Sequence, residues 1–81
     1  MKKYRISYLK HEYGLTREPY HEKKEFPFST DEKAKEYYDK INQNAKRGLN
    51  PFGKDEKDIK YWYEFISLTR IDREEEATII A

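Results

Sequence analysis

The segment from Ile59 to Ile71 places apolar side chains on both faces of any extended strand that it forms. Large apolar residues occupy both its odd and its even positions: Tyr61, Tyr63 and Phe65 on one side, and Trp62, Ile66 and Leu68 on the other. A strand with one solvated face normally alternates apolar and polar residues. The sequence therefore predicts either a central strand that is buried on both faces, or a β-bulge near Phe65 that switches the inward-facing set.

The chain is long enough for one small domain, spanning residues 1–81, and for one core. Leu, Ile and Phe number 15 and Val is absent, but 13 aromatic residues supply apolar area that the aliphatic residues do not. The 17 basic and 16 acidic residues nearly cancel. A folded domain with a thin, aromatic core is expected, because disorder is typical of chains with high net charge.

The N-terminal segment from Lys3 to Glu12 alternates with a period of two and predicts a half-buried strand with Tyr4, Ile6 and Tyr8 inward. A second strand is predicted from Glu18 to Phe28.

Antiparallel pairing of these strands with residue numbers summing to about 32 sets Tyr4 beside Phe28 and Ile6 beside Phe26, which matches their apolar faces. Pro27 limits the second strand to an edge of the sheet or to its own end.

A helix is predicted from Thr30 to Arg47. Ser29 is the first candidate for its N-cap, paired with Glu32 in a capping box, and Thr30 is the alternative. Gly48 suits a left-handed C-terminal cap. One apolar stripe is expected to face the sheet: Ala34, Tyr37, Tyr38, Ile41 and Ala45.

A last short strand is predicted at Ala77–Ile80, paired within the chain to the Ile59–Ile71 strand rather than to a second molecule. The order is β-β-α-β-β, which predicts an α+β fold with a small, mainly antiparallel sheet and one helix packed on one face.

Several functional classes lack their residues in this sequence. Without cysteine there is no disulfide framework and no thiolate metal site, and no apolar run resembles a signal peptide or a membrane span, so a cytoplasmic protein is expected. His11 and His21 would oppose each other in the predicted hairpin, but no independent ligand spacing supports a metal site. We expect no catalytic residues, no metal and no cofactor, and hence no enzyme.

Two binding functions remain open. Tyrosines with neighbouring lysines can stack single-stranded nucleic acid, and the candidates are Tyr4, Tyr8, Tyr61 and Tyr63 with Lys3, Lys24 and Lys60. The balanced charge disfavours this function. A protein-binding surface is favoured, because one helix covers only one sheet face and because aromatic residues are enriched at interfaces. Its candidate residues are Tyr13, Tyr20, Phe52, Trp62 and Tyr63.

The chain also resembles a class of small proteins. It is short, lacks cysteine and is rich in lysine and tyrosine; it opens on Lys2-Lys3-Tyr4-Arg5-Ile6, and Phe26-Pro27-Phe28-Ser29-Thr30-Asp31-Glu32 leads into one helix. In these respects it is similar to accessory proteins of phages and mobile elements, of the anti-CRISPR and wider anti-defence kind. The resemblance implies a non-enzymatic inhibitor that occupies a surface of a host protein, such as a nuclease or defence complex. A homodimer is a further expectation, which follows from the two-faced strand because one helix leaves its other face uncovered. A small phage structural or regulatory protein is the other possibility.

Overall fold

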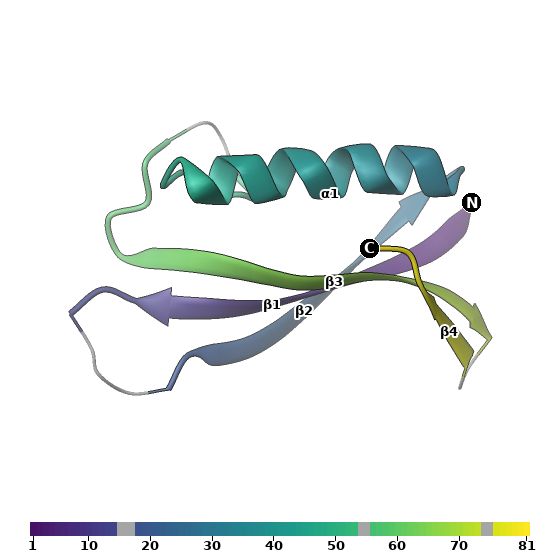
Figure 1. The fold of residues 1–81 in the computed structure, drawn as a ribbon, viewed down its shortest axis with the longest axis horizontal. Coiled ribbons are helices and arrows are strands. Elements are labelled where there is room, and N and C mark those ends of the chain that lie inside the picture. Colours follow the sequence, from purple (N-terminus) through teal and green to yellow (C-terminus); the bar gives the residue numbers. More distant parts are fainter. Residues whose placement is uncertain (15–17, 54–55, 74–75) are drawn as a thin grey trace.

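The computed structural model describes residues 1–14, 18–53, 56–73 and 76–81. Its elements follow the predicted order and confirm the α+β fold: β1 (Lys2–Glu12), β2 (Tyr20–Phe28), α1 (Asp31–Lys46), β3 (Tyr61–Arg73) and β4 (Glu76–Ile79). The strands form one antiparallel sheet in the order β2-β1-β3-β4, and α1 lies across one face (Figure 1). The first predicted residue of the long strand was wrong, because Ile59 lies before β3 and is exposed.

The register of the β1–β2 hairpin differs from the predicted one by two residues. Tyr4 pairs with Phe26 and Lys2 with Phe28, so the paired residue numbers sum to 30 in this structure. A period-two pattern determines which side chains share a face, but it does not distinguish registers that differ by two. The ring of Tyr4 still meets Phe28 diagonally, with centroids 5.8 Å apart. The edge position inferred from Pro27 is confirmed, because β2 is an outer strand.

Helix α1 begins after Thr30, whose side-chain oxygen accepts a hydrogen bond from the Lys33 N–H at 3.2 Å. The N-cap is thus the alternative candidate and not Ser29. Gly48, which follows the C-cap, adopts the expected positive φ of 75°. In the part of the chain that the structure describes, no helix is long and apolar enough to cross a membrane.

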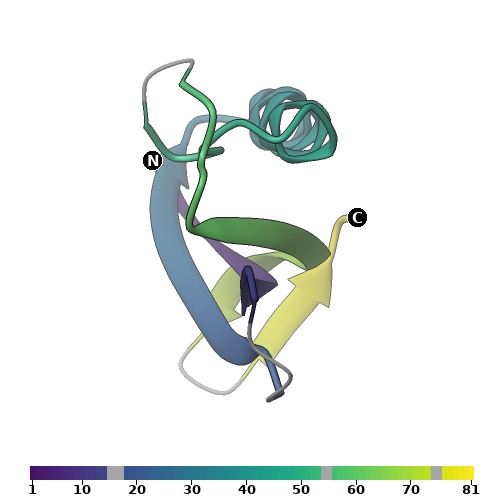
Figure 2. The same cartoon turned by 90° about the vertical axis from the view of Figure 1, so that its left-hand side faces the viewer.

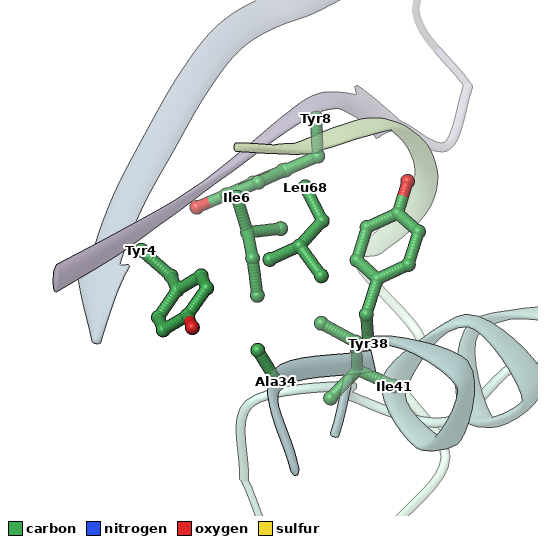
Figure 3. Packing of buried hydrophobic residues seen from close by; sticks show 7 residues of the cluster. All are labelled: Tyr4, Ile6, Tyr8, Ala34, Tyr38, Ile41 and Leu68. Atoms are coloured by element: carbon green, nitrogen blue, oxygen red, sulfur yellow. The ribbon is translucent and has the colours of Figure 1, made fainter. Parts of the chain in front are cut away.

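The core lies between α1 and the sheet face that meets it. Seven buried residues form it, and Figure 3 shows their side chains converging from the two layers: Tyr4, Ile6 and Tyr8 from β1, Leu68 from β3, and Ala34, Tyr38 and Ile41 from α1. Three of the five residues in the predicted helical stripe are therefore fully buried, and Tyr37 packs against the margin of the core.

A β-bulge determines which residues of β3 join this core. Ser7 pairs with Ser67, but Tyr8 pairs with Phe65, so Ile66 is an extra residue. Leu68 is fully buried, whereas Ile66 is 54% exposed although it lies only two positions away. Of the two predicted alternatives, burial on both faces is wrong, because Trp62 and Ile66 are exposed, and the bulge near Phe65 is confirmed. The inward set changes there from odd to even positions.

β4 pairs with β3 inside the chain, with Arg70 opposite Thr78, which confirms the predicted pairing. The contact extends past β4, since the Ile80 N–H donates to the Leu68 carbonyl at 2.8 Å.

A polar network joins the first turn of α1 to the sheet. The Tyr4 hydroxyl donates to Asp31 Oδ1 at 2.5 Å, and the Arg70 guanidinium donates to Asp31 Oδ2 at 2.6 Å. Arg70 also donates to Asp72, which accepts a hydrogen bond from the Thr78 hydroxyl. These contacts lower the pKa of Asp31, mainly through Tyr4, and that of Asp72, mainly through Thr78. Burial and Asp31 raise the pKa of Tyr4 to about 12.

We predict that Leu68→Ala lowers the free energy of unfolding by about 2–5 kcal/mol, because it leaves a cavity between two layers. Ile66→Ala, a matched change on the same strand, should cost less than about 1 kcal/mol, because Ile66 is exposed. Urea denaturation of both variants measures the difference. Equal losses would place both residues on one face and contradict the bulge.

We predict that stability falls at both pH extremes. The pKa values of Asp31 and Asp72 are lower in the native state than in the unfolded chain, where they are about 4. These groups therefore stabilise the fold above about pH 4, and this stabilisation is lost as the pH falls through their native pKa values. The raised pKa of Tyr4 contributes stability below pH 10.0 that is lost as pH rises toward about 12.

Urea midpoints across this pH range measure the effect. Asp31→Asn should flatten the acid limb, whereas Asp39→Asn, a matched change at an exposed helix position, should leave it unchanged. An acid limb that is identical in all three proteins would contradict the role of Asp31.

Candidate interaction surface

The face of the sheet turned away from α1 is called the outer face below. Tyr4, Ile6 and Tyr8 point toward α1, so the alternate residues of β1 point the other way. With their cross-strand partners they form the outer face, which includes Arg5, Ser7, Leu9 and His11 of β1, His21, Lys23 and Glu25 of β2, Trp62, Glu64 and Ile66 of β3, and Ile79 of β4. In Figure 2, α1 lies on one side of the twisted sheet only, and no described helix or strand covers the other side.

Large apolar side chains are exposed on the outer face. Trp62 is 38% exposed, Ile66 54% and Ile79 76%. Trp62 and Ile66 belong to this face because the bulge returns their even positions to the side opposite the core. Single exposed apolar residues are normal, but several on one uncovered sheet face mark a candidate interaction site.

A hollow of about 320 Å³ lies on the outer face beside Ile66. Its lining includes Ser7, His21 and Lys23 in addition to Ile66. Ser7 lies opposite both Lys23 of β2 and Ser67 of β3. Because the side chains of Ser7 and Ser67 are short, they leave a depression in the outer face at this point. The hollow also contacts Tyr8 and Glu22, so it combines the apolar Ile66 side with a polar side that carries both a base, Lys23, and an acid, Glu22.

Trp62 is held against the sheet by His11, its cross-strand partner. The two rings stack with centroids 3.7 Å apart and planes 7° apart. The His11 Nε2 atom lies 2.6 Å from Glu64 Oε1 without the geometry of a hydrogen bond, and the two side chains form an ion pair only when His11 is protonated. The stack orders the exposed indole ring, which lowers the entropy that a partner would have to remove on binding.

The charged side chains of the outer face near the start of β1 are largely paired with one another. The Arg5 guanidinium donates two hydrogen bonds to Glu25 Oε2, at 2.8 and 3.2 Å. Arg5 is the main cause that lowers the pKa of Glu25. This end of the outer face therefore presents an exposed ion pair rather than a region of one sign.

The structure separates the five predicted interaction residues. Trp62 lies on the outer face, Tyr13 is exposed in the turn after β1, and Tyr20 is the exposed first residue of β2. Phe52 and Tyr63 lie on the helix side, where they contact each other and pack against the core. No single surface unites the five.

Phe52 and Tyr63 extend the core beyond the end of the helix. The Phe52 ring lies 5.1 Å from the Tyr8 ring and 5.7 Å from the Phe65 ring. Tyr63 donates to Asp58 at 3.5 Å, and burial together with Asp58 raises the pKa of Tyr63 to about 12. Both rings thus contribute apolar area that the few aliphatic residues do not supply.

Two of the four tyrosines considered for stacking nucleic acid are in the core. Tyr4 and Tyr8 are buried, so neither ring presents a face to a base. Tyr61 is only partly buried and lies beside two lysines: Lys10 Nζ is 4.1 Å and Lys60 Nζ 5.3 Å from its ring centroid.

The predicted pairing of His11 with His21 across the hairpin, which was considered for a metal site, was wrong. The two-residue register difference places His21 opposite Leu9, and His11 lies opposite Trp62 on the other side of β1. No group of three or more metal-ligating side chains occurs among the residues that the structure describes.

Of the outer-face residues named above, only Trp62 was predicted as an interaction residue; those missed include His11, Glu64, Ile66 and Ile79. The signal for Ile66 was present, because alternation places Trp62 and Ile66 on one face and a bulge near Phe65 turns Leu68 to the other. The sequence carried no comparable signal for His11 or Glu64, since their contact depends on the pairing of β1 with β3.

Comparison with known proteins identified no relative: no family model, no curated protein and no solved structure matches this chain. Function must therefore be inferred from the chain itself.

We predict that acrylamide quenches the fluorescence of Trp62, the single tryptophan, in the native protein with a constant below that of the urea-unfolded chain. His11→Ala should increase quenching, because it uncovers the stacked face of the indole. His21→Ala is the matched control and should change nothing. Native protein that resists quenching would place Trp62 in the core.

Proposed function

We propose that this chain is a non-enzymatic protein-binding module that acts by occupying a surface of a partner protein. The observation that carries the proposal is the uncovered outer face, on which Trp62 and Ile66 are exposed beside a hollow of about 320 Å³. Tryptophan is among the residues that contribute most to binding energy, particularly when it is already ordered.

The surface favours a partner with a particular pattern of groups. An apolar side chain would lie over Ile66 and the Trp62 ring, and a polar group that can pair with both Lys23 and Glu22 would lie in the hollow. Apolar contact would supply most of the affinity, and the charged groups at the margin would orient the partner.

In its specific form, the proposed role is that of a phage or mobile-element inhibitor that acts in the host cytoplasm on a defence protein, such as a nuclease. The sequence resemblance supports this form. An inhibitor that works by occupying a surface needs an exposed, ordered recognition surface and no catalytic group, which agrees with the outer face.

Single-stranded nucleic-acid binding is the second candidate function. Lys10 and Lys60 around the Tyr61 ring favour it, since such clusters combine stacking with attraction to phosphate. The burial of Tyr4 and Tyr8 leaves it with a smaller platform.

The proposal predicts that Trp62→Thr and Ile66→Thr each reduce capture of a partner protein from host lysate by about tenfold or more, because each removes apolar contact while keeping a residue suited to strands. Quantitative mass spectrometry of proteins retained by the immobilised chain measures this. Ile59→Thr is the control, since Ile59 is 90% exposed but lies outside the sheet.

Two results would overturn the proposal. One is a set of captured proteins that is the same for wild type and for both outer-face variants. The other is no protein capture together with binding of single-stranded DNA that weakens steeply with salt, which would favour the nucleic-acid function.

A further inference from the structure

The free edge of β2 differs from the outer face as a possible binding surface, because an edge offers backbone hydrogen bonds. β2 pairs with β1 on one side and is the end strand of the sheet. Every side chain from Tyr20 to Glu25 is exposed. Helix α1 packs mainly over β3, so it leaves space beside this edge.

The direction of the backbone groups in β1 follows from the hydrogen bonds at the opposite end of the sheet. Alternate residues of a strand direct their N–H and C=O groups to opposite sides. Leu68 exchanges bonds with Ile80 and Ala81, so the neighbouring Ser67 faces β1. Its partner Ser7 therefore faces β3.

The same alternation continues into β2. Because Ser7 faces β3, the next residue, Tyr8, faces β2, and its partner Glu22 faces back toward β1. The N–H and C=O groups of His21, Lys23 and Glu25 consequently point away from the sheet. They form an unpaired row to which another strand can add.

The residues that precede Lys23 are complementary in charge and in aromatic character to those that follow it. In an antiparallel pair of two β2 strands with Lys23 at the twofold axis, each residue meets the one at the same distance on the other side of Lys23. Glu22 then faces Lys24 of the second copy, His21 faces Glu25, and Tyr20 faces Phe26. Opposite charges and aromatic pairs facing each other across strands are stabilising.

Two prolines bracket this segment symmetrically. Pro19 and Pro27 lie four positions before and after Lys23; Pro27 shares the outward direction of His21 and Glu25, and Pro19 directly precedes β2. A proline cannot donate a backbone hydrogen bond, and in this register each proline faces the other, so the missing donors fall together in the two end pairs and not inside the ladder. The ladder would therefore end at the same point in both directions.

Neighbouring registers are less favourable. In the proposed register the numbers of paired residues sum to 46. The outward-facing backbone groups also permit sums of 44 and 48, which place Glu22 or Lys24, respectively, opposite the same residue of the second copy. Both close pairs would be repulsive. In the register centred on Lys23, only Lys23 meets its own copy, in a hydrogen-bonded pair with the wider Cα spacing of about 5.5 Å. Charge would thus both hinder unrelated strands and select one register.

We propose that a second copy of this chain pairs with the β2 edge, antiparallel and centred on Lys23, to form a twofold-symmetric dimer with a continuous eight-stranded sheet. In a twofold contact the same surface is used by both copies, which the Tyr20–Phe26 segment satisfies. The outer faces of the two copies would lie on one side of this sheet. The proposal does not rest on the partner-binding function, because it uses the backbone edge of β2, whereas partner binding rests on Trp62 and Ile66; the two surfaces meet at His21 and Lys23, whose side chains line the hollow.

Charge reversal and mixing test the pairing directly. Sedimentation equilibrium of wild type from micromolar concentration to about 1 mM should show a reversible dimer. Glu22→Lys and Lys24→Glu should each weaken self-association about tenfold or more, because each places like charges opposite one another twice. An equimolar mixture of the two variants should dimerise again, because the opposed charges are then complementary.

The mixing experiment separates pairing from damage to the monomer. Glu22 accepts a hydrogen bond from Tyr8, and Lys24 lies over the Phe52 ring, so either variant can disturb its own fold. Such damage would persist in the mixture, whereas lost pairing would be restored. A wild type that is monomeric at every concentration, or a mixture that stays monomeric while wild type dimerises, would overturn the proposal.

A cysteine crosslink tests the register. Lys23→Cys places two thiols at the axis, within the Cα separation that a disulfide spans, and should give a covalent dimer under mild oxidation. His21→Cys is the matched control on the same strand and face, where the two copies of the residue lie far apart. Faster crosslinking at position 21 than at position 23 would refute the centred register. Trp62→Thr and Ile66→Thr should leave dimerisation intact, which separates this proposal from partner binding.

Discussion

The bulge at Ile66 is the constraint on which the rest of the structure depends. One helix covers one sheet face, so β3 must direct a single set of side chains toward α1 although its sequence is apolar on both sides. The extra residue allows Phe65 on one side of the bulge and Leu68 on the other to reach the same core. The cost is that Trp62 and Ile66 are exposed on the other face. The core and the candidate interaction surface are therefore two results of one irregularity.

Aromatic residues fill the core of this chain, as aliphatic residues do in larger proteins, and acidic residues accept hydrogen bonds from the tyrosine hydroxyl groups. Tyr4 and Tyr8 are buried, and their hydroxyl groups end at Asp31 and Glu22. Tyr63 likewise reaches Asp58. A buried tyrosine needs a partner for its hydroxyl group, and a chain that is 41% charged can supply one at the margin of the core. High charge and high aromatic content are thus related properties of this sequence.

The sequence predicted the features that depend on local pattern and missed those that depend on pairing. Alternation and helical spacing were sufficient for the element order and for the burial of Ala34, Tyr38 and Ile41, and they left the bulge as one of two alternatives. Hairpin register was not predictable to within two residues, because a shift of two preserves the faces. The five predicted interaction residues do not lie on one surface, because their positions also depend on contacts between distant parts of the chain. Whether Phe52 or Tyr63 is exposed depends on Tyr8 and Phe65, which are distant in sequence.

The central position of β1 has a consequence for the order of folding. β1 pairs with β2 through a short hairpin, but its other edge is completed only by β3, where Lys3 meets Ile71. The hairpin and α1 rest on local contacts and can form early, whereas closing the β1–β3 ladder requires a loop that spans most of the chain. Until β3 arrives, the apolar faces of the hairpin and of α1 have no complete core, and one edge of β1 is open to other chains. The slowest step in folding is therefore expected to be the docking of β3, the segment with the highest apolar content.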